Sequence, residues 1–353
     1  MAFASGYFKT TYASDLSLVE TRSRWGCLII LIVGLIVLPF FASAFLLDLA
    51  NQVFLALIGA VALMLLTGYA GQISLGHAGL IAAGAFTTAI LFKELNAPIL
   101  VTLPASGLVG ATLGIIFGLP SLRLKGLYLA LSTLALHFIV TYLGAEYEAK
   151  RGFATGVVID SPSFGPFVIE DPRLWYFLLL LIDILVIVFA INLVRSRTGR
   201  AWMAVRDRDV AAEALGIEVS SYKLSAFVVS SVMTCIAGCL FAYFRGFVSV
   251  EAFSLLMTIE YVAMIIIGGL GSILGAILGT IFIVLLPYTI DAVVDVFQLP
   301  ARLTTYMFAI KYATFGLIMI IFLVFEPSGL VGIWRRIRDY FILWPFKYKP
   351  LGG

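Results

Sequence analysis

The stretch LWYFLLLLIDILVIVFAINLV (residues 174–194) decides the fold class, because its only charged side chain is Asp183. An α-helix of about 20 apolar residues crosses the roughly 30 Å hydrocarbon layer of a bilayer. Similar windows lie at 27–47, 50–67, 98–118, 127–143, 223–244 and 305–325, with shorter or glycine-interrupted ones at 78–92, 256–268 and 271–290. The sequence therefore predicts an all-α integral membrane protein with about ten transmembrane helices, some interrupted or short.

The composition supports the same class and excludes several others. The chain has 353 residues, of which 62% are apolar and 12% charged, outside the range of soluble globular domains. A net charge of +3 is too small to indicate nucleic-acid binding. Cys27, Cys235 and Cys239 lie within apolar stretches, which indicates packing rather than a disulfide framework or a metal site. Neither a GxxxxGK[ST] phosphate loop nor an HExxH motif is present, so we expect no cofactor, no metal and no enzyme activity in this chain.

Basic residues orient the predicted helices. With both termini in the cytoplasm, the clusters at 195–223 and 335–349 lie on the cytoplasmic side, as the positive-inside rule requires. Arg123 and Lys125 then lie on that side as well. We expect a cytoplasmic N-terminal tail of residues 1–24, a single transmembrane domain of residues 25–335 and a cytoplasmic C-terminal tail of residues 336–353. The first apolar run is about twice the length of a signal-peptide core, which indicates an uncleaved span.

The segment GRAWMAVRDRDVAAEALGI (residues 199–217) is a short helix-like stretch on the cytoplasmic side. Asp209 can cap a helix start, and Gly216 is a plausible stop. Helices of under roughly 12 residues are marginal in water without tertiary support. Something must therefore pack on its Ala/Leu face, either this chain's own bundle or a separate soluble protein.

Two stretches are too rich in glycine to be plain helices. Residues 68–79 (GYAGQISLGHAG) contain three polar candidates for a translocation path: Gln72, Ser74 and His77. The alternative is a tight interfacial turn in which His77 bonds a neighbouring carbonyl. Residues 268–275 (GGLGSILG) form the second interruption, and paired broken segments are typical of a transporter's central site.

Ionisable side chains within apolar spans are costly and indicate function. His137, Asp183 and Glu260, with its neighbour Tyr261, are candidates for the path, and hydrogen bonding within the bundle is the alternative. Glycines at every fourth position, 110–118 and 271–279, predict close helix packing. The acidic outer segment 144–173 is either a docking surface for an extracytoplasmic partner or a solvated loop.

Four stretches together resemble the branched-chain amino acid type of ABC-transporter permease. They are GQISLGHAGLIAAGAF (71–86), LRLKGLYLALSTLAL (122–136), residues 199–217 followed by SSYKLSAFVVSS (220–231), and IIIGGLGSILGAILG (265–279). The resemblance implies a bacterial inner-membrane permease that pairs with a homologous second permease subunit, two cytoplasmic ATPase subunits and a periplasmic solute-binding protein. It also implies that 202–216 is the coupling helix that contacts the ATPase. The expected coupling residues are Trp202, Val205, Arg206, Asp209, Ala211, Ala212, Leu215 and Gly216.

The resemblance makes branched-chain amino acids the leading substrate. Residues 150–156 (KRGFATG) depart from the TGG-like stretch of many relatives, and the family also includes urea, short-amide and aromatic-acid systems. An ion-coupled secondary carrier using Asp183, Glu260 or His137 is a further alternative. The exposed cytoplasmic helix favours the importer, since a self-sufficient carrier has no need of a docking element.

Overall fold

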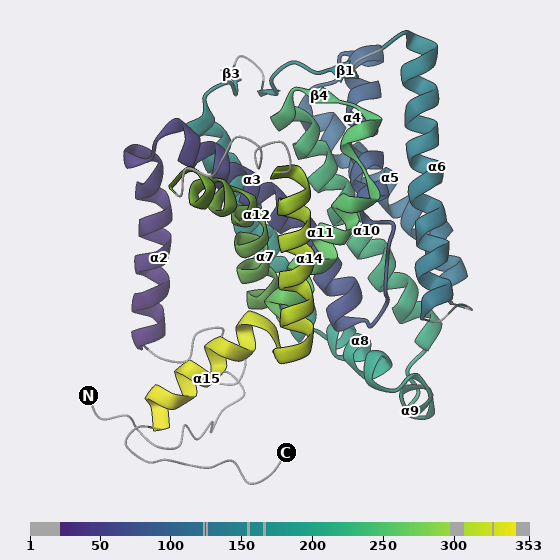
Figure 1. Ribbon diagram of the computed structural model, residues 1–353. Coiled ribbons are helices and arrows are strands. Elements are labelled where there is room, and N and C mark those ends of the chain that lie inside the picture. Colours follow the sequence, from purple (N-terminus) through teal and green to yellow (C-terminus); the bar gives the residue numbers. More distant parts are fainter. Residues whose placement is uncertain are drawn as a thin grey trace.

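The computed structural model describes residues 22–122, 124, 126–153, 156–164, 167–296, 307–326 and 328–343 (Figure 1). Most of the two expected tails, together with Arg123 and Lys125, lies outside the described residues. The helices are α2 (Arg22–Phe41), α3 (Ala44–Leu63), α4 (His77–Leu95), α5 (Ile99–Ser121), α6 (Leu127–Arg151), α7 (Pro172–Arg195), α8 (Arg197–Asp207), α9 (Asp209–Ala214), α10 (Val219–Arg245), α11 (Leu255–Gly268), α12 (Ile273–Val296), α14 (Met307–Phe325) and α15 (Gly329–Leu343). A π-helical stretch, η1 (Met64–Tyr69), continues α3, and a 3-10 turn, η2 (Val250–Ala252), precedes α11.

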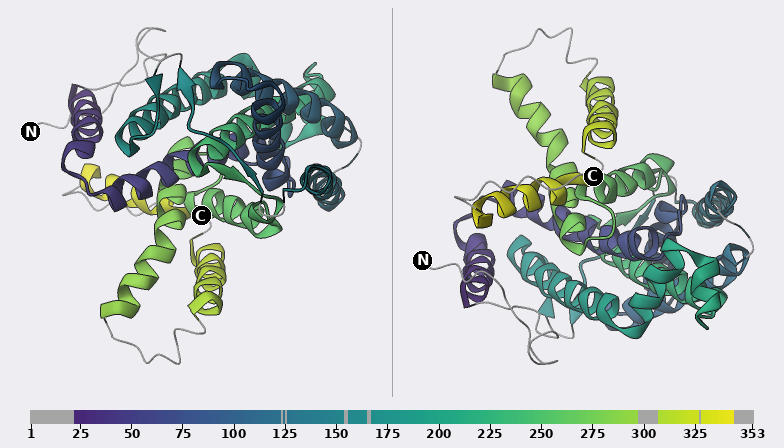
Figure 2. Two further views of the ribbon diagram at one scale, coloured as in Figure 1. Left: turned by 90° about the horizontal axis from the view of Figure 1, so that it is seen from above. Right: turned by 90° about the horizontal axis from the view of Figure 1, so that it is seen from below.

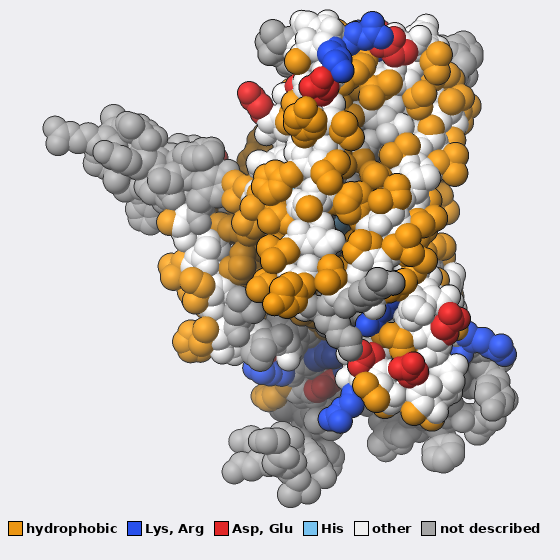
Figure 3. All heavy atoms as spheres, turned by 90° about the vertical axis from the view of Figure 1, so that its right-hand side faces the viewer, with side chains coloured by type: hydrophobic (Ala, Val, Ile, Leu, Met, Phe, Trp, Pro, Cys, Tyr) orange, Lys and Arg blue, Asp and Glu red, His pale blue; other side chains and the backbone are white. Residues whose placement is uncertain are grey.

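The predicted all-α membrane fold is confirmed. In the described part of the chain, 8 helices are long and apolar enough to cross a membrane, and two shorter apolar helices cover Trp25–Phe41 and Ala313–Phe322. Figure 3 shows a broad apolar band on the face in view, between two ends that carry the charged side chains. Helices α8, α9 and α15 lie at one end, and the short strands lie at the other (Figure 1). The basic clusters mark the first of these ends as cytoplasmic.

The boundary between the first two helices differs from the prediction. The sequence windows placed the break near residue 49, whereas α2 ends at Phe41 and α3 begins at Ala44. The Ser43 hydroxyl accepts a hydrogen bond from the Leu46 amide at 3.3 Å and so caps α3. A capping serine in an apolar run sets the helix start, although hydropathy alone does not reveal it.

The helix α7 shows how local sequence sets a boundary. The Asp171 carboxylate accepts a hydrogen bond from the Arg173 amide at 2.8 Å, and Pro172 occupies the first helical position. Both features stabilise a helix N-terminus, because they satisfy or remove donors that have no partner within the helix. The apolar stretch from which the fold class was inferred therefore begins at a well-defined residue.

Helix α10 lies at the centre of the bundle and packs closely on α4 and α5. A Cβ at Gly84 would overlap the Cys235 carbonyl, and a Cβ at Gly110 would lie 2.6 Å from the Ser231 carbonyl oxygen. The Cys235 thiol donates to the Leu80 carbonyl at 3.1 Å. These contacts confirm the packing role predicted for the fourfold-spaced glycines at 110–118 and for Cys235, whereas Cys27 is exposed and differs from the prediction.

Four two-residue strands lie at the outer end. β1 (Val157–Val158) pairs antiparallel with β4 (Phe247–Val248), and β2 (Ser163–Phe164) pairs with β3 (Phe167–Val168). The β1–β4 pair ties the outer segment 144–173 to the end of α10. Glu148 also accepts a hydrogen bond from the Val250 amide at 3.1 Å. Part of this segment is thus integrated into the fold.

The cytoplasmic end carries α15, which crosses the expected boundary between residues 335 and 336. This helix carries exposed arginines and exposed apolar side chains, Trp334 and Ile337 among them. The tail boundary at residue 336 stays a prediction.

Figure 2 shows α12 and α14 side by side at one edge of the bundle.

Candidate functional site

The cytoplasmic segment folds as two helices that are partly buried against the bundle. Trp202 of α8 is buried, and its indole Nε1 donates to the Ser225 hydroxyl of α10 at 3.1 Å. Val205 and Ala212 are buried as well. Leu215, at the end of α9, is 82% exposed. The bundle of this chain therefore supports the inner face of the segment, and the apolar Leu215 side chain on the outer face is left uncovered.

Of the two local signals in this segment, the stop is confirmed and the cap is not. Helix α9 begins at Asp209, but its N-cap residue is Arg208 and no side chain caps it; the Asp209 carboxylate accepts a hydrogen bond from the adjacent Val210 amide at 3.0 Å. Gly216 follows the helix with φ +82°, a left-handed conformation that glycine adopts without strain. The preceding helix α8 starts at Arg197, and the Ser196 hydroxyl caps it by accepting from the Gly199 amide at 3.3 Å. The predicted segment began later, at Gly199, although Ser196 is a residue type that favours the N-cap position.

Arg206 connects α8 to the first broken segment. Its Nη1 donates to the Gly68 carbonyl at 2.7 Å, where η1 leaves the regular helix before the chain becomes non-helical at residues 70–76. Gln72 lies just beyond, and its Nε2 donates to the Lys223 carbonyl at 2.9 Å, at the start of α10. The break at membrane depth is therefore held by polar groups of the cytoplasmic elements, as irregular backbone in a membrane requires.

The second broken segment reaches the same place. Gly271 lies between α11 and α12 with φ +76°, and a Cβ there would lie 3.1 Å from Arg206 Nη1. A Cβ at Gly68 would lie 2.8 Å from the Gly271 amide nitrogen. The two interruptions, about 200 residues apart in the sequence, thus meet beside one arginine.

Three of the polar candidates for the path are buried in packing contacts in this structure. His77 is buried, with its ring centroid 4.7 Å from that of Tyr261. Ser74 is buried and accepts a hydrogen bond from the Gly76 amide at 3.3 Å. His137 is buried where α6 meets α4, and a Cβ at Gly79 would lie 2.6 Å from its Cα.

Three other candidates lie on cavities. Gln72 lines a pocket of about 270 Å³ at the cytoplasmic end, together with Arg206 and Asp209. Glu260 and Tyr261 line a larger cavity of about 410 Å³. The structure therefore does not gather the six predicted path residues into one site, but it does divide them between two pockets and the surrounding core.

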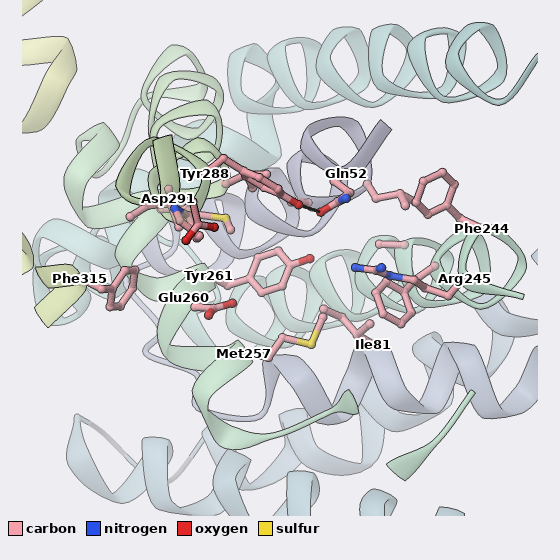
Figure 4. Close-up of a pocket in the computed structure, with 18 residues that line it drawn as sticks. Gln52, Ile81, Phe244, Arg245, Met257, Glu260, Tyr261, Tyr288, Asp291 and Phe315 are labelled. Atoms are coloured by element: carbon pink, nitrogen blue, oxygen red, sulfur yellow. Dashed lines mark hydrogen bonds between the residues drawn. The ribbon is translucent and has the colours of Figure 1, made fainter. Parts of the chain in front are cut away.

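The larger cavity lies between α3, α10, α11, α12 and α14 (Figure 4). Its volume is within the range of small-molecule sites, and most of its wall is apolar. The polar side chains on the wall are Gln52, Arg245, Glu260, Tyr261, Tyr288 and Asp291. The Tyr288 hydroxyl donates to Gln52 Oε1 at 3.0 Å, which joins α12 to α3 across the cavity.

A second pocket of about 370 Å³ adjoins the first toward the outer loops. It shares Phe241, Arg245, Met257 and Glu260 with the larger cavity, and its other lining residues include Ala252. The two pockets are therefore neighbours that share these four side chains. Arg245 was not among the predicted path residues, because nothing in the nearby sequence indicates that α10 ends beside α11.

Comparisons with known proteins agree with a membrane permease. The family model described as "Branched-chain amino acid transport system / permease component" matches residues 45–323. The high-affinity branched-chain amino acid transport system permease protein LivM of Salmonella typhimurium is 30% identical over 87% of this chain and 75% of its own length. The Escherichia coli LivM protein is 29% identical with the same coverage. The autoinducer 2 import system permease protein LsrC of Yersinia enterocolitica is 30% identical over 45% of this chain and 42% of its own length. No solved structure matches the chain.

Proposed function

The chain belongs to the family of branched-chain amino acid transport system permease components, and from this premise we propose that it imports branched-chain amino acids as the membrane subunit of an ABC transporter. The observation that carries the proposal is the similarity to LivM permeases over 87% of the chain. A cavity with an apolar wall and a few polar groups, reached from the outer end, suits a small solute with an aliphatic side chain. The bacterial inner membrane is the location that this function implies.

The energy source in this proposal is a pair of ATPase subunits that dock on the cytoplasmic helices. The exposed side of α9 supports this assignment, since Val210 is 74% exposed and Leu215 is 82% exposed at a charged end of the bundle. Apolar side chains that are exposed beside charged ones are typical of protein contact surfaces. Of the expected coupling residues, Ala211, Leu215 and Gly216 lie on the exposed side, whereas Trp202, Val205 and Ala212 hold the segment to the bundle.

Arg206 is the element that would transmit the movement. ATPase closure would displace α8 and α9, and the bond from Arg206 to the Gly68 carbonyl would carry that displacement to the broken end of α3. Gly271 lies against the same guanidinium, so α12 would respond as well. Two helix interruptions that share one contact form an element that the ATPase can bias between inward-facing and outward-facing arrangements.

The remaining partners are a homologous second permease subunit and a solute-binding protein. The binding protein would dock at the outer end, where the strand pairs and the acidic residues of segment 144–173 lie. From there the solute would enter the outer pocket and then the larger cavity.

The test is solute uptake by the complete complex in proteoliposomes. Labelled leucine should accumulate when loaded binding protein is outside and ATP is accessible to the ATPase, and an imposed proton or sodium gradient should not replace ATP. Uptake of labelled urea in preference to leucine would reassign the substrate. Accumulation by this chain alone under an ion gradient would show a secondary carrier instead. Autoinducer 2 is the second candidate solute, because an autoinducer 2 import system permease also matches part of the chain.

A further inference from the structure

Arg245 and Glu260 face one space from two neighbouring helices. Arg245 ends α10 and Glu260 lies in α11, and both line the larger cavity as well as the outer pocket. Figure 4 shows both side chains reaching into this space on either side of Tyr261, whose hydroxyl points toward Arg245. They lie where the two neighbouring pockets adjoin.

The described residues provide neither group with a hydrogen bond or an ion pair. Arg245 contacts the Phe241 ring, with the guanidinium carbon 5.7 Å from the ring centroid. Glu260 is half-buried, whereas Arg245 is exposed at the end of α10. A half-buried carboxylate within an apolar span is costly to keep unless something pairs with it. Two opposite charges on neighbouring helices, with no ion pair between them, complement a ligand that carries both charges.

We propose that Arg245 and Glu260 form a binding site for the charged backbone groups of a free α-amino acid. The Arg245 guanidinium presents paired N–H donors that match a carboxylate, and the Glu260 carboxylate accepts hydrogen bonds from an ammonium group. The aliphatic side chain of the solute lies on the apolar wall, which includes Met257, Met264 and Ile283. This inference rests on the proposed function and adds to it the residues that recognise the solute within the membrane.

The site distinguishes amino acids from neutral solutes by charge. Urea, short amides and sugars offer neither a carboxylate nor an ammonium group, so they would leave the half-buried Glu260 carboxylate without a charged partner and would give Arg245 no carboxylate to bind. A compound with only one of the two charges would satisfy one wall residue. The order of binding should therefore be the zwitterion first, singly charged analogues second and neutral solutes last.

The experiment measures occupancy by protection of a cysteine at the junction. Met257→Cys is introduced in a Cys27→Ser background, since Cys27 is exposed whereas Cys235 and Cys239 are buried. The complete complex in nanodiscs is labelled with a small water-soluble thiol reagent, with and without vanadate-trapped nucleotide. The probes are leucine, leucinamide, which lacks the carboxylate, and isocaproate, which lacks the ammonium group.

We expect leucine to protect the cysteine at about tenfold lower concentration than either analogue, as one charge-assisted hydrogen bond implies. With Glu260→Gln, leucine should protect no better than isocaproate, because the ammonium group no longer has a partner. With Arg245→Gln, leucine should protect no better than leucinamide. Asp339→Asn is the control, because Asp339 pairs with Arg338 on an exposed part of α15 and lines neither pocket, and it should leave the order unchanged.

Several results would overturn the inference. Equal protection by all three probes, with Arg245 and Glu260 unchanged, would reject recognition of the solute by its charges. A cysteine that is unreactive in every nucleotide state would reject it as well, because the site would then not be open to a solute. If a glutamine variant fails to assemble with the ATPase, Glu260→Asp and Arg245→Lys keep the charges and should retain the preference for leucine; loss of that preference would count against the site. Leucine uptake by the native complex tests the proposed function separately, so native uptake with unchanged protection in the variants would reject this site alone.

Discussion

The bond between Arg206 and the Gly68 carbonyl offers the sharpest test of how the cytoplasmic helices act on the membrane domain. Arg206→Ala removes the donor and leaves α8 without its hydrogen bond to the broken end of α3. A hydrogen bond to a charged group is worth about 1.5–3 kcal/mol. The Arg206 side chain is 35% exposed and also bonds Asp207, so the lower value applies. About 1.5 kcal/mol corresponds to roughly a tenfold change in an equilibrium.

We therefore expect Arg206→Ala to lower leucine uptake per ATP hydrolysed by about tenfold while the ATPase still assembles with the permease. Uptake of labelled leucine and release of phosphate are measured in the same proteoliposomes, so that a loss of coupling is distinguished from a loss of protein. The matched control is Arg200→Ala, because Arg200 lies on the same helix and donates to the Arg195 carbonyl at 2.6 Å without reaching either break. An unchanged ratio in Arg206→Ala, or an equal loss in Arg200→Ala, would refute the reasoning.

Three further predictions concern the docking surface, the packing and the path. Leu215→Asp should abolish ATPase copurification without changing the melting temperature, because the Leu215 side chain is exposed. Ala212→Asp should lower the melting temperature, because it buries a carboxylate. The opposite pattern would show that the faces of α9 are misassigned. Gly279→Ala should destabilise the pairing of α11 and α12, since a Cβ there would overlap the Met264 carbonyl, and an unchanged melting temperature would contradict close packing. Gln72→Cys should react with a small water-soluble reagent in only one nucleotide state, because Gln72 is buried here at the edge of a pocket, and equal reactivity in both states would argue against a role in gating.

Much of the fold was predictable because each transmembrane span is a local property. A helix that crosses lipid must satisfy its backbone internally and be apolar over a length set by the bilayer, so a window such as 174–194 identifies itself. Breaks were also visible, since glycine-rich runs at 68–79 and 268–275 interrupt that pattern. The boundary at Ser43 was not predicted, because one capping hydroxyl in an apolar run has little effect on hydropathy.

The candidate site was predicted only in part. Glu260 and Tyr261 were identified as rare polar groups in an apolar span, and they do line the larger cavity. His77, Ser74 and His137 were selected by the same logic, but they are buried in packing contacts in this structure. The bundle does not satisfy both histidines fully, because His77 Nε2 and His137 Nδ1 have no hydrogen-bond partner among the described residues. The sequence near Arg245 did not identify it as a cavity residue, because Glu260, which lines the same cavity, belongs to another helix.

The amino-acid sequence alone determined that the chain is a membrane bundle, where most of its spans lie and where two helices are interrupted, and it predicts which end faces the cytoplasm. These properties follow from length, apolar content, charge and glycine within short segments, which act over a few residues. Only the tertiary structure decided that both interruptions meet at Arg206, that Leu215 faces outward while Ala212 faces inward, and that Arg245 and Glu260 share one space. Contacts between distant segments depend on how the helices pack against one another, and packing is a property of the whole chain rather than of any one window.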